Sequence, residues 1–330
     1  MRGAKIVSTG RYLPEKVILN TDLEQLMDTS DEWITQRTGI LERRYAEGDE
    51  TTSSMGAVAA KRAMEKAGLE PGDIDYVIFA TLSSDYFFPG SGVLVQDMLG
   101  LDCVGALDVR NQCTGFIYGL SIAESFVKIG KFENILVIGS EIHSCGLDFS
   151  TEGRDISVLF GDGAGAAVVG PSGKGEGILT THMNSEGKHA RELWCEAPGS
   201  RSNPRITDEI LREKRHFPHM NGRFVFTNAV KRFKETILEA LDANDLSRES
   251  LSLIIPHQAN LRISQAVAKS MELAEDKVFS NIHRYGNTTA ASIPIALDEC
   301  LENGLIKEGD IVCLAAFGSG FTWGSALLRW

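Results

Sequence analysis

The feature that most constrains the fold is an order of helices and strands that occurs twice along the chain. Each half has an amphipathic helix, a short apolar strand, a helix that begins after a polar junction, and a second apolar strand. We predict these elements at 52–67, 76–81, 114–130 and 135–139 in the first half, and at 226–241, 251–255, 293–301 and 311–315 in the second. Ile78 and Ile135 are 57 residues apart, and so are Ile254 and Ile311. Matching order at matching spacing indicates an internal duplication, and two such α/β halves predict stacked layers of helix and sheet.

The two junctions carry different polar residues. Cys113 lies 35 residues after Ile78, where a short apolar strand over 106–109 turns into the first helix. Asn287 lies 33 residues after Ile254, before the second helix. If the halves pack about a pseudo-twofold axis, Cys113 and Asn287 face each other across the seam between them.

Cys113 has two interpretations. The helix that follows it carries only Glu124 and Lys128 as charged residues, so it is apolar nearly all round and is expected inside the domain. The free N–H groups and the dipole at the start of such a helix favour an anion, which predicts a lowered pKa and a reactive thiolate for Cys113. The alternative is a small hydrophobic core residue, the common role of a free cysteine.

Charge and cysteine content argue against several classes of protein. The formal net charge of −12 disfavours a general nucleic-acid binder and means that an acidic partner needs a local basic patch. The six cysteines lack paired CxxC spacing, which argues against a zinc site or a secreted disulfide framework. No apolar run is long enough for a membrane span, and the first residues are typical of a strand rather than a signal peptide. We therefore expect a cytoplasmic protein that binds no metal, no nucleic acid and no membrane.

Four polar segments are candidates for a site at the seam. Cys113 is the first, and His257 directly follows the apolar strand over 251–255, at the end of the strand where α/β sheets place ligands. Asn287 stands in Tyr-Gly-Asn-Thr, and the glycines within 317–321 permit a tight turn with inward N–H groups. Together they supply a nucleophile, proton or charge partners and an oxyanion site. Taken singly, His257 is explained as a buried histidine, Asn287 as a helix N-cap and 317–321 as an ordinary turn.

The sequence around these residues resembles one enzyme family. The motifs are Asn-Gln-Cys-Thr-Gly-Phe around Cys113, Pro-His-Gln-Ala-Asn-Leu-Arg-Ile around His257 and Gly-Asn-Thr-Thr-Ala-Ala-Ser around Asn287. Further matching motifs begin at Thr29, Phe160 and Phe317. From end to end the chain resembles β-ketoacyl-acyl-carrier-protein synthase III of the thiolase superfamily. The resemblance implies an α/β thiolase-like fold of five layers, α-β-α-β-α, built from two similar halves, in agreement with the repeat.

The resemblance implies a two-step condensation that initiates fatty-acid synthesis. The Cys113 thiolate attacks an acyl-CoA thioester, by default acetyl-CoA, while the N–H groups of Cys113 and Ser319 hold the oxyanion. Malonyl-acyl-carrier protein then enters, and His257 and Asn287 donate hydrogen bonds to its thioester oxygen while decarboxylation leaves an enolate. This carbanion attacks the acyl-cysteine and gives a β-ketoacyl-acyl-carrier protein. The coenzyme A thioester is a substrate, and no metal and no permanently bound cofactor are implied.

The resemblance also assigns binding residues. Trp33 and Arg154 are expected to sandwich the adenine of coenzyme A, and Arg37 to contact its phosphates. Arg262 and Lys269 are expected to dock the acidic carrier protein, which a basic patch would steer toward this acidic chain.

The expected assembly and domains follow from the same resemblance. Phe88 resembles the loop residue that reaches the acyl pocket of the neighbouring subunit, which implies a homodimer. We divide the chain into an N-terminal half, 1–170, with the nucleophile, a connecting or insertion segment, 171–225, and a C-terminal half, 226–330, with the histidine and asparagine.

The sequence departs from the family pattern at two places. Thr227 stands at a basic position of the carrier-docking helix, and Lys231, Arg232 and Lys234 either compensate for it or form only the solvated face of that helix. The segment 201–219 is longer than in the housekeeping enzyme and carries five Lys and Arg residues. It either reshapes the acyl entrance or is a surface insertion, so the starter acyl group is open between acetyl and longer or branched chains.

Two other functions remain as alternatives. One is a related enzyme of specialised metabolism that uses a longer or branched acyl donor, or that moves the acyl group from Cys113 to another acceptor without decarboxylation. The other is a non-enzymatic module that binds a carrier protein or acyl-CoA. The presence of both His257 and Asn287 favours decarboxylative condensation.

Overall fold

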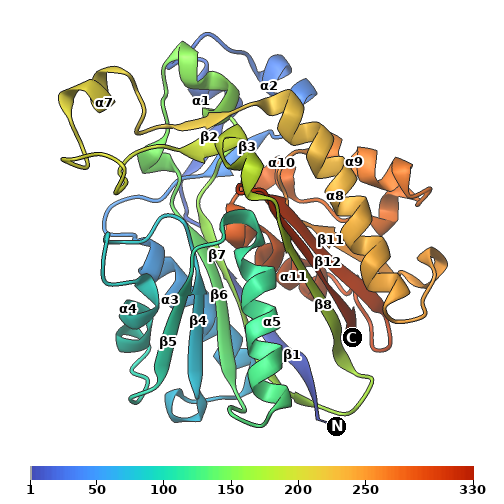
Figure 1. Ribbon diagram of the computed structural model, residues 1–330. Helices are drawn as coiled ribbons and strands as arrows, with labels where there is room; N and C mark the ends of the chain where they lie inside the picture. Colours follow the sequence, from blue (N-terminus) through green and yellow to red (C-terminus); the bar gives the residue numbers. More distant parts are fainter. Residues whose placement is uncertain (1) are drawn as a thin grey trace.

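The computed structural model describes residues 2–330, and its core is two mixed β-sheets that lie side by side (Figure 1). The first sheet has the order β1-β7-β6-β4-β5, with bounds Gly3–Tyr12, Gly163–Ser172, Ile135–Glu141, Tyr76–Ala80 and Gly105–Val109. The second has the order β11-β12-β13-β8, with bounds Leu253–Pro256, Ile311–Gly318, Thr322–Arg329 and Gly177–Ser185.

The two sheets share one pairing pattern, as an internal duplication predicts. Strands β4 and β6 are parallel with Tyr76 opposite Ile135, and β11 and β12 are parallel with Leu253 opposite Val312, so the partner lies 59 residues later in both sheets. The next two strands are antiparallel in each sheet, β7 and β1 in the first and β13 and β8 in the second. The counterpart of β5 is reduced to a single bridge to Val278.

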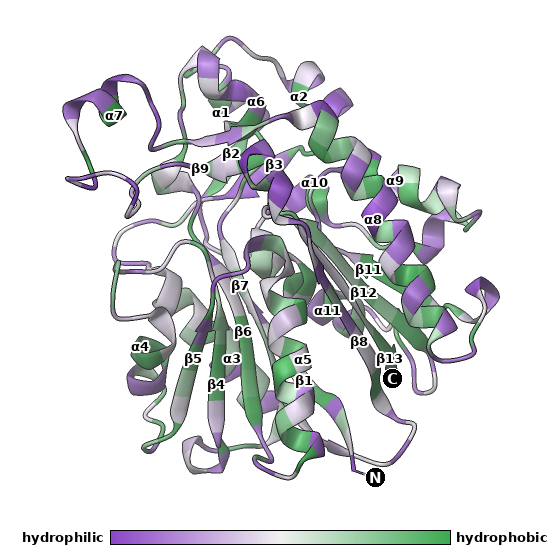
Figure 2. Cartoon of the chain, viewed as in Figure 1, coloured by the Kyte–Doolittle hydropathy of each residue, from purple (hydrophilic) through white to green (hydrophobic). Residues whose placement is uncertain are grey.

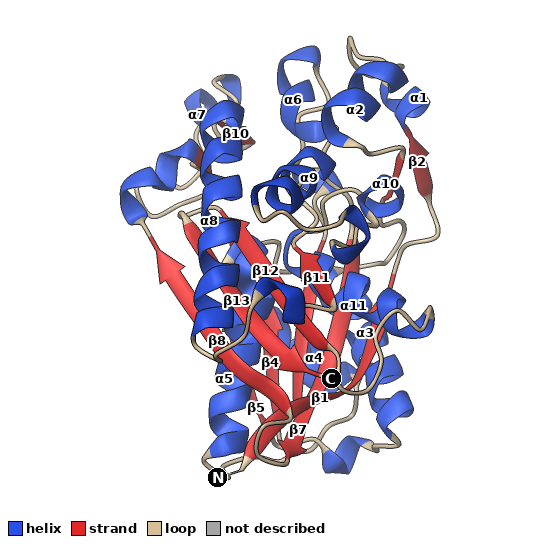
Figure 3. Cartoon of the chain, turned by 90° about the vertical axis from the view of Figure 1, so that its right-hand side faces the viewer, coloured by secondary structure: helices blue, strands red, loops and turns tan. Residues whose placement is uncertain are grey.

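Helices complete five layers, which confirms the predicted fold class. The outer layers are α3 (Thr52–Ala67) with α4 (Ser91–Met98) on the first sheet, and α8 (Gly222–Asp242) with α9 (Leu261–Ser270) on the second. Helices α5 (Gly115–Lys128) and α11 (Ser292–Glu302) lie between the sheets and share one apolar core with both of them. Figure 3 shows α8 and α9 covering the second sheet from outside.

The apolar patterns of the sequence follow these layers. Helix α5 is covered on two sides, and Phe116, Ile117 and Leu120 are fully buried. Helix α8 is covered on one side and alternates hydrophobic and hydrophilic stretches, whereas the strands of both sheets are predominantly hydrophobic (Figure 2). Burial of a side chain such as Leu120 contributes about 1.5–3 kcal/mol, so the doubly covered central layer supplies a large part of the hydrophobic stabilisation.

Shorter elements lie at one end of the layers, at the top of Figure 1. They are α1 (Asn20–Leu23), α2 (Asp31–Thr38), α6 (Arg154–Ser157), α7 (Asp208–Arg212), α10 (Ile282–Tyr285) and the strand pairs β2 (Val17–Leu19) with β3 (Glu42–Arg44) and β9 (Leu193–Cys195) with β10 (Pro218–Met220). Ser30 begins α2 by accepting a hydrogen bond from the N–H of Trp33, as its sequence predicts.

The proposed domain boundaries at 170 and 225 stay a prediction. The topology adds that 171–225 is more than a connector, because β8 within it is an edge strand of the second sheet. Within residues 2–330, no helix combines the length and the apolar character needed to span a bilayer.

Candidate active site

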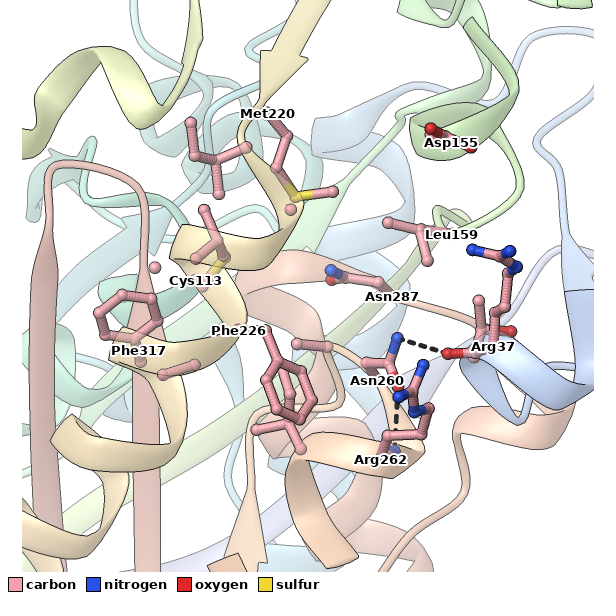
Figure 4. Close-up of a pocket in the computed structure, with 18 of the residues that line it drawn as sticks. Arg37, Cys113, Asp155, Leu159, Met220, Phe226, Asn260, Arg262, Asn287 and Phe317 are labelled. Atoms are coloured by element: carbon pink, nitrogen blue, oxygen red, sulfur yellow. Dashed lines mark hydrogen bonds between the residues drawn. The ribbon is translucent and has the colours of Figure 1, made fainter. Parts of the chain in front are cut away.

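A cavity of about 600 Å³ lies between α8, α9 and the loops at the carboxyl ends of the central strands. Cys113, His257 and Asn287 all line it, so the structure brings the three expected catalytic side chains to one place. Figure 4 shows Asn287 directed toward Cys113, with Arg37 and Arg262 at the other side of the cavity. Apolar side chains that include Phe226, Phe317 and Met220 form much of the wall between these ends.

Cys113 is held in a buried 3₁₀ turn, Gln112–Thr114, directly before α5. Gln112 has a φ of +45°, a left-handed conformation that is uncommon for a residue with a side chain. Gly318 of β12 packs against the nucleophile, since a Cβ there would lie 2.7 Å from the Cβ and 3.0 Å from the Sγ of Cys113. The tight turn and the missing side chain at 318 therefore fix the position of the sulfur.

The prediction of a lowered pKa for Cys113 is wrong for this structure. Burial, together with the negative charge of Glu141, raises the pKa of the thiol to about 12. Hydrogen bonds from the backbone N–H groups of Cys113 and Ser319 act in the opposite direction but are outweighed. The helix start does favour the thiolate, but the loss of water around the sulfur is the larger effect.

The two expected oxyanion donors are both at the sulfur. The N–H groups of Cys113 and Ser319 lie near enough to the Cys113 thiol to favour its thiolate form, so both are close to the atom on which an acyl group would be formed. Ser319 is fixed by its hydroxyl, which donates to the Leu193 carbonyl, and by its own carbonyl, which accepts from the Thr322 hydroxyl at 3.1 Å. Backbone donors held in this way need little reorganisation when charge develops.

His257 is oriented by a serine that sequence reasoning missed. Its Nδ1 lies 2.7 Å from the hydroxyl oxygen of Ser292, which also accepts a hydrogen bond from the N–H of Gln258 at 3.4 Å. With the Ser292 hydroxyl assigned as the donor to Nδ1, the ring proton is on Nε2. Nε2 is buried and has no protein partner within residues 2–330, so it is a free donor in the cavity.

Burial also keeps the His257 ring neutral. Desolvation, together with the nearby His143, lowers the pKa of His257 to about 3. A neutral imidazole with its proton on Nε2 donates a hydrogen bond without acting as a strong acid or base at neutral pH.

Asn287 is fixed on both its backbone and its side chain. Its N–H donates to the Leu159 carbonyl at 2.8 Å, and its carbonyl accepts from Gly161 at 3.1 Å. Its Oδ1 accepts from the N–H of Thr289 at 2.9 Å, which leaves Nδ2 as the donor directed into the cavity. The side chain thus caps the 3₁₀ turn Thr289–Ala291 rather than α11, whose N-cap is Ala291.

The side of the cavity far from Cys113 is cationic. Arg37 and Arg262 are exposed there (Figure 4), and the cavity lining also includes the exposed Arg223 and one carboxylate, Asp155, although the whole chain carries a net charge of −12. Asn260 joins two of the contributing helices, because its Oδ1 accepts from Arg262 N–H and its Nδ2 donates to the Arg37 carbonyl. Sequence reasoning missed Arg223, which has no motif of its own and is recognised only by its position on α8.

Trp33 lies between two arginines at this side. The guanidinium carbons of Arg37 and Arg154 are 4.5 Å and 5.0 Å from the centre of its ring. An aromatic group between Trp33 and Arg154 needs about 7 Å, two contact distances of roughly 3.5 Å. The expected adenine sandwich therefore requires Arg154 to move away from Trp33.

The expected carrier-protein contacts lie outside the catalytic end of the cavity. Arg262 and Lys269 are both exposed and stand seven residues apart on α9, so they share one face of that helix. On α8, Arg232 pairs with Glu186 and Glu235.

The remaining cations of α8 are only partly free to replace a basic residue at position 227. Lys234 donates to the Ser270 carbonyl at 2.9 Å, while Lys231 stays exposed. Thr227 itself lines the cavity, and its hydroxyl donates to the carbonyl of Arg223 one turn earlier.

The segment 201–219 does not line this cavity within the described chain. Its Lys214 binds Asp148 and Glu152, and its Arg215 binds Glu196 and Glu213. These ion pairs favour a folded surface insertion over a basic acyl entrance.

An aromatic loop lies beside this insertion. Tyr86, Phe87 and Phe88 are exposed by 60%, 61% and 79% of their area. Arg205 of the insertion stacks on Phe87 with its guanidinium carbon 4.1 Å from the ring centre. Phe88 does not line the cavity of its own chain.

Among residues 2–330, no group of three or more His, Cys, Asp or Glu side chains is arranged to hold a metal ion.

Comparison with known proteins gives one consistent family. Residues 107–187 match the family model 3-oxoacyl-[acyl-carrier-protein] synthase III, and residues 241–330 match the model of its C-terminal part. The chain is 46% identical over 327 residues to β-ketoacyl-[acyl-carrier-protein] synthase III of Caldanaerobacter subterraneus subsp. tengcongensis, covering 99% of this chain and 98% of that protein.

Solved structures agree with this. The crystal structure of 3-oxoacyl-[acyl-carrier-protein] synthase III from Aquifex aeolicus superposes with a TM-score of 0.91 at 45% identity, covering 99% of this chain and 100% of that one. The priming β-ketosynthase of the R1128 polyketide pathway gives a TM-score of 0.90 at 34% identity, with coverage of 99% and 96%. With the motifs, the duplicated fold and the shared cavity, these matches show that the chain belongs to the β-ketoacyl-[acyl-carrier-protein] synthase III family of thiolase-fold condensing enzymes.

Proposed function

We propose that this enzyme condenses an acyl-CoA with malonyl-acyl-carrier protein through an acyl thioester on Cys113, and so initiates fatty-acid synthesis. One observation carries the assignment of residues. The backbone N–H groups of Cys113 and Ser319 favour the Cys113 thiolate, and Cys113 lines the same cavity as His257, whose Nε2 has no protein partner within residues 2–330, and Asn287. A nucleophile with its oxyanion site and a separate pair of neutral donors suits a two-step acyl transfer.

The first step forms the acyl-enzyme. The Cys113 sulfur attacks the carbonyl carbon of the acyl-CoA thioester, and the carbonyl oxygen becomes an oxyanion held by Cys113 and Ser319 N–H. The tetrahedral intermediate collapses with cleavage of the bond to the coenzyme A sulfur. Coenzyme A leaves as the thiol with the proton that Cys113 loses. Because burial raises the pKa of Cys113 to about 12, proton loss and attack are expected to be coupled to substrate binding.

The second step makes the carbon–carbon bond. Nε2 of His257 and Nδ2 of Asn287 donate hydrogen bonds to the thioester oxygen of malonyl-acyl-carrier protein. They stabilise the enolate formed when the bond to the carboxylate breaks and carbon dioxide leaves. The enolate carbon attacks the acyl carbon on Cys113, and the cysteine sulfur leaves and regains a proton. Loss of carbon dioxide supplies the carbanion, so two neutral donors suffice and no strong base is needed.

The cationic side of the cavity suits the common part of both substrates. Coenzyme A and a carrier protein's phosphopantetheine arm both bring phosphate, and Arg37, Arg223 and Arg262 provide guanidinium groups for it. Trp33 and Arg154 offer stacking surfaces to the adenine after Arg154 moves. Arg262 and Lys269 on the exposed face of α9 provide the basic patch for the acidic carrier protein.

The quaternary structure that we propose is a homodimer in the cytoplasm. The support for a dimer is the exposed aromatic loop, in which Phe88 is the least covered member and lies outside its own cavity. An exposed aromatic cluster of this kind marks an interaction surface. Six free cysteines support a reducing compartment.

A second candidate function differs in the acyl group that the enzyme first transfers from coenzyme A to Cys113. The R1128 relative is a priming enzyme of a polyketide pathway by its name, and its fold is as similar as that of the Aquifex enzyme. The apolar wall with Phe226, Phe317 and Met220 leaves both acetyl and longer or branched starters as substrates to test.

Intact-protein mass spectrometry tests the proposal. The enzyme is mixed with acyl-CoAs from acetyl to dodecanoyl, including branched forms, and the labelled peptide is mapped. Acetyl labelling of Cys113 supports an initiator of fatty-acid synthesis, and preferential labelling by longer or branched chains supports a specialised synthase. Labelling that persists in Cys113→Ala, or no label from any acyl-CoA, would contradict the proposed first step.

A further inference from the structure

A second buried histidine lies beside the site and has no role in the chemistry described above. His143 directly follows β6 and Ile142, and only 8% of its area is exposed. Its ring stacks on Phe160, with centroids 4.4 Å apart and planes at 30°. Its backbone N–H donates to the Asp162 carboxylate at 2.7 Å. The stacking therefore holds the ring, and the hydrogen bond to Asp162 holds the backbone of the same residue.

The ring makes one side-chain hydrogen bond, and it goes to the loop that carries Asn287. Nε2 of His143 lies 2.5 Å from the hydroxyl oxygen of Thr289, a buried pair 146 residues apart in sequence. The backbone N–H of Thr289 in turn donates to Oδ1 of Asn287 at 2.9 Å. This makes a continuous path from His143 to the amide of Asn287.

Thr289 needs support from outside its own loop. Its φ is +50°, in the left-handed region, where a β-branched residue such as threonine is an outlier. Such a conformation persists only when surrounding contacts hold it. If Thr289 relaxes to an ordinary conformation, its N–H turns away from Asn287 Oδ1, and nothing then fixes which atom of the amide faces the cavity.

We propose that His143 is a positioning residue for Asn287: its hydrogen bond to Thr289 holds that residue in the left-handed conformation that keeps the Asn287 Nδ2 donor directed at the substrate thioester. The inference rests on the role proposed for Asn287 in decarboxylation. It assigns His143 to the second step alone, since no contact joins the His143 ring to Cys113 or Ser319 among the hydrogen bonds of residues 2–330.

The protonation state of His143 suits this role. Burial lowers its pKa to about 3, so the ring is neutral at neutral pH and its Nε2 contact with Thr289 does not change with small changes in pH. A neutral ring also leaves the field at His257 unchanged, whereas a charged one would oppose any positive charge there.

The test separates the two half-reactions. Formation of acetyl-Cys113 is followed by intact-protein mass, and release of carbon dioxide from malonyl-acyl-carrier protein is followed with the acetylated enzyme. His143→Leu removes the hydrogen bond, and Thr289→Val removes its partner hydroxyl with little change in shape. We expect each to lower carbon dioxide release about tenfold while acetylation stays within about twofold. The double variant should be no slower than either single one, because both break the same contact.

Conservative variants distinguish positioning from packing. His143→Gln keeps a donor near Nε2 but loses the stacking on Phe160, and Thr289→Ser keeps the hydroxyl; both should recover carbon dioxide release to within about threefold of wild type. Equal losses in acetylation and carbon dioxide release, additive losses in the double variant, or wild-type decarboxylation in His143→Leu would each overturn the inference. Asn287→Ala is measured beside them. Normal decarboxylation by Asn287→Ala would contradict the proposed function of Asn287. If Asn287→Ala fails to decarboxylate but His143→Leu decarboxylates normally, only the role of His143 is contradicted.

Discussion

The turn that carries Cys113 and the turn at Thr289 occupy equivalent positions in the two halves but carry different chemistry. Each is a buried 3₁₀ turn whose first residue is left-handed, Gln112 with a φ of +45° and Thr289 with a φ of +50°. Each leads after three residues into one of the two central helices. The second residue of the turn is Cys113 in the first half and Ala290 in the second.

The packing around the two turns is also reciprocal. Gly318, from the second sheet, packs against Cys113, and Gly139, from the first sheet, packs against Ala290. Each half therefore closes the turn of the other half with a strand glycine. The second half has no nucleophile in its turn and instead supplies His257 and Asn287 from neighbouring loops. The duplicated frame fixes positions, and single residues within it decide the chemistry.

The largest expected effect on the first step comes from breaking this reciprocal packing. A Cβ at Gly318 would lie 3.0 Å from the Cys113 sulfur, so Gly318→Ala should displace the nucleophile and slow acetylation about 100-fold, the loss expected for a misplacement near 1 Å. A Cβ at Gly139 would lie 2.4 Å from the Ala290 carbonyl oxygen, a backbone atom. Gly139→Ala should therefore mainly lower the free energy of unfolding, by about 1–3 kcal/mol.

Both predictions are checked by two measurements on each variant. Intact-protein mass spectrometry gives the acetylation rate, and urea unfolding gives the free energy of unfolding. Wild-type acetylation in Gly318→Ala would show that the sulfur is not fixed by this contact. A stability loss in Gly318→Ala larger than that in Gly139→Ala would reverse the assignment of the two glycines.

A smaller expected effect concerns the influence of Glu141 on the pKa of Cys113. Glu141 is fully buried at the end of β6 and raises the pKa of Cys113. Its own pKa is raised by burial to about 7, so it is charged at pH 9. Glu141→Gln should lower the pKa of Cys113 and increase its alkylation by iodoacetamide at pH 9 about tenfold, as a decrease of one pH unit in the pKa would give.

Peptide mapping of the alkylated protein gives the control. Exposed Cys103 should react at the same rate in both proteins. Unchanged or slower alkylation of Cys113 in Glu141→Gln would mean that hydrogen bonding by Glu141 to Thr81 and Leu82 matters more than its charge.

Much of the arrangement of helices and strands was predictable from the sequence, because the patterns that determine each element lie in or beside that element. Helix α3 was predicted at 52–67 and is observed with those bounds, since its apolar spacing lies within the segment and its caps, Thr51 and Gly68, directly flank it. The equal spacing of apolar strands likewise predicted an internal duplication, and the two parallel strand pairs have the same register offset. Motifs then placed Cys113, His257 and Asn287, and the structure brings all three to one cavity.

The electrostatics and the supporting residues were not predictable in this way. The pKa of Cys113 was predicted in the wrong direction, because burial and the charge of Glu141 depend on segments distant in sequence. Ser292, Arg223 and His143 carry no motif, and each acquires a role only through a neighbour that folding brings to it. Arg154 was expected opposite Trp33 with room between them, whereas the two side chains are in contact.

A further expected effect concerns the pH dependence of stability. Burial lowers the pKa of His143 from 6.5 to about 3, so it stabilises the fold above pH 6.5, and this contribution is lost as the pH falls toward 3. The variant His143→Leu has no histidine at this position and therefore does not lose this stability contribution as the pH falls. The difference in free energy of unfolding between wild type and variant should therefore decrease by about 2 kcal/mol from pH 7 to pH 5. The contribution of Glu141 is expected to be equal in both proteins and to cancel in the difference, and that of His257 cancels apart from the smaller part that His143 causes.

Urea unfolding at the two pH values measures this difference. His219→Leu, at an exposed position, is the matched control and should keep a constant difference from wild type. A difference that widens for His143→Leu at pH 5 would mean that this histidine is charged in the folded protein.

The division of labour between the halves is tested most directly by His257→Ala, with His219→Ala as its control. Acetylation of Cys113 from acetyl-CoA and release of carbon dioxide from malonyl-acyl-carrier protein are measured on the same preparation. For His257→Ala we predict acetylation within about threefold of wild type. Carbon dioxide release should fall about 100-fold or more, the effect of removing a stabilising donor. Loss of acetylation with decarboxylation intact would contradict this prediction and place His257 in the first step.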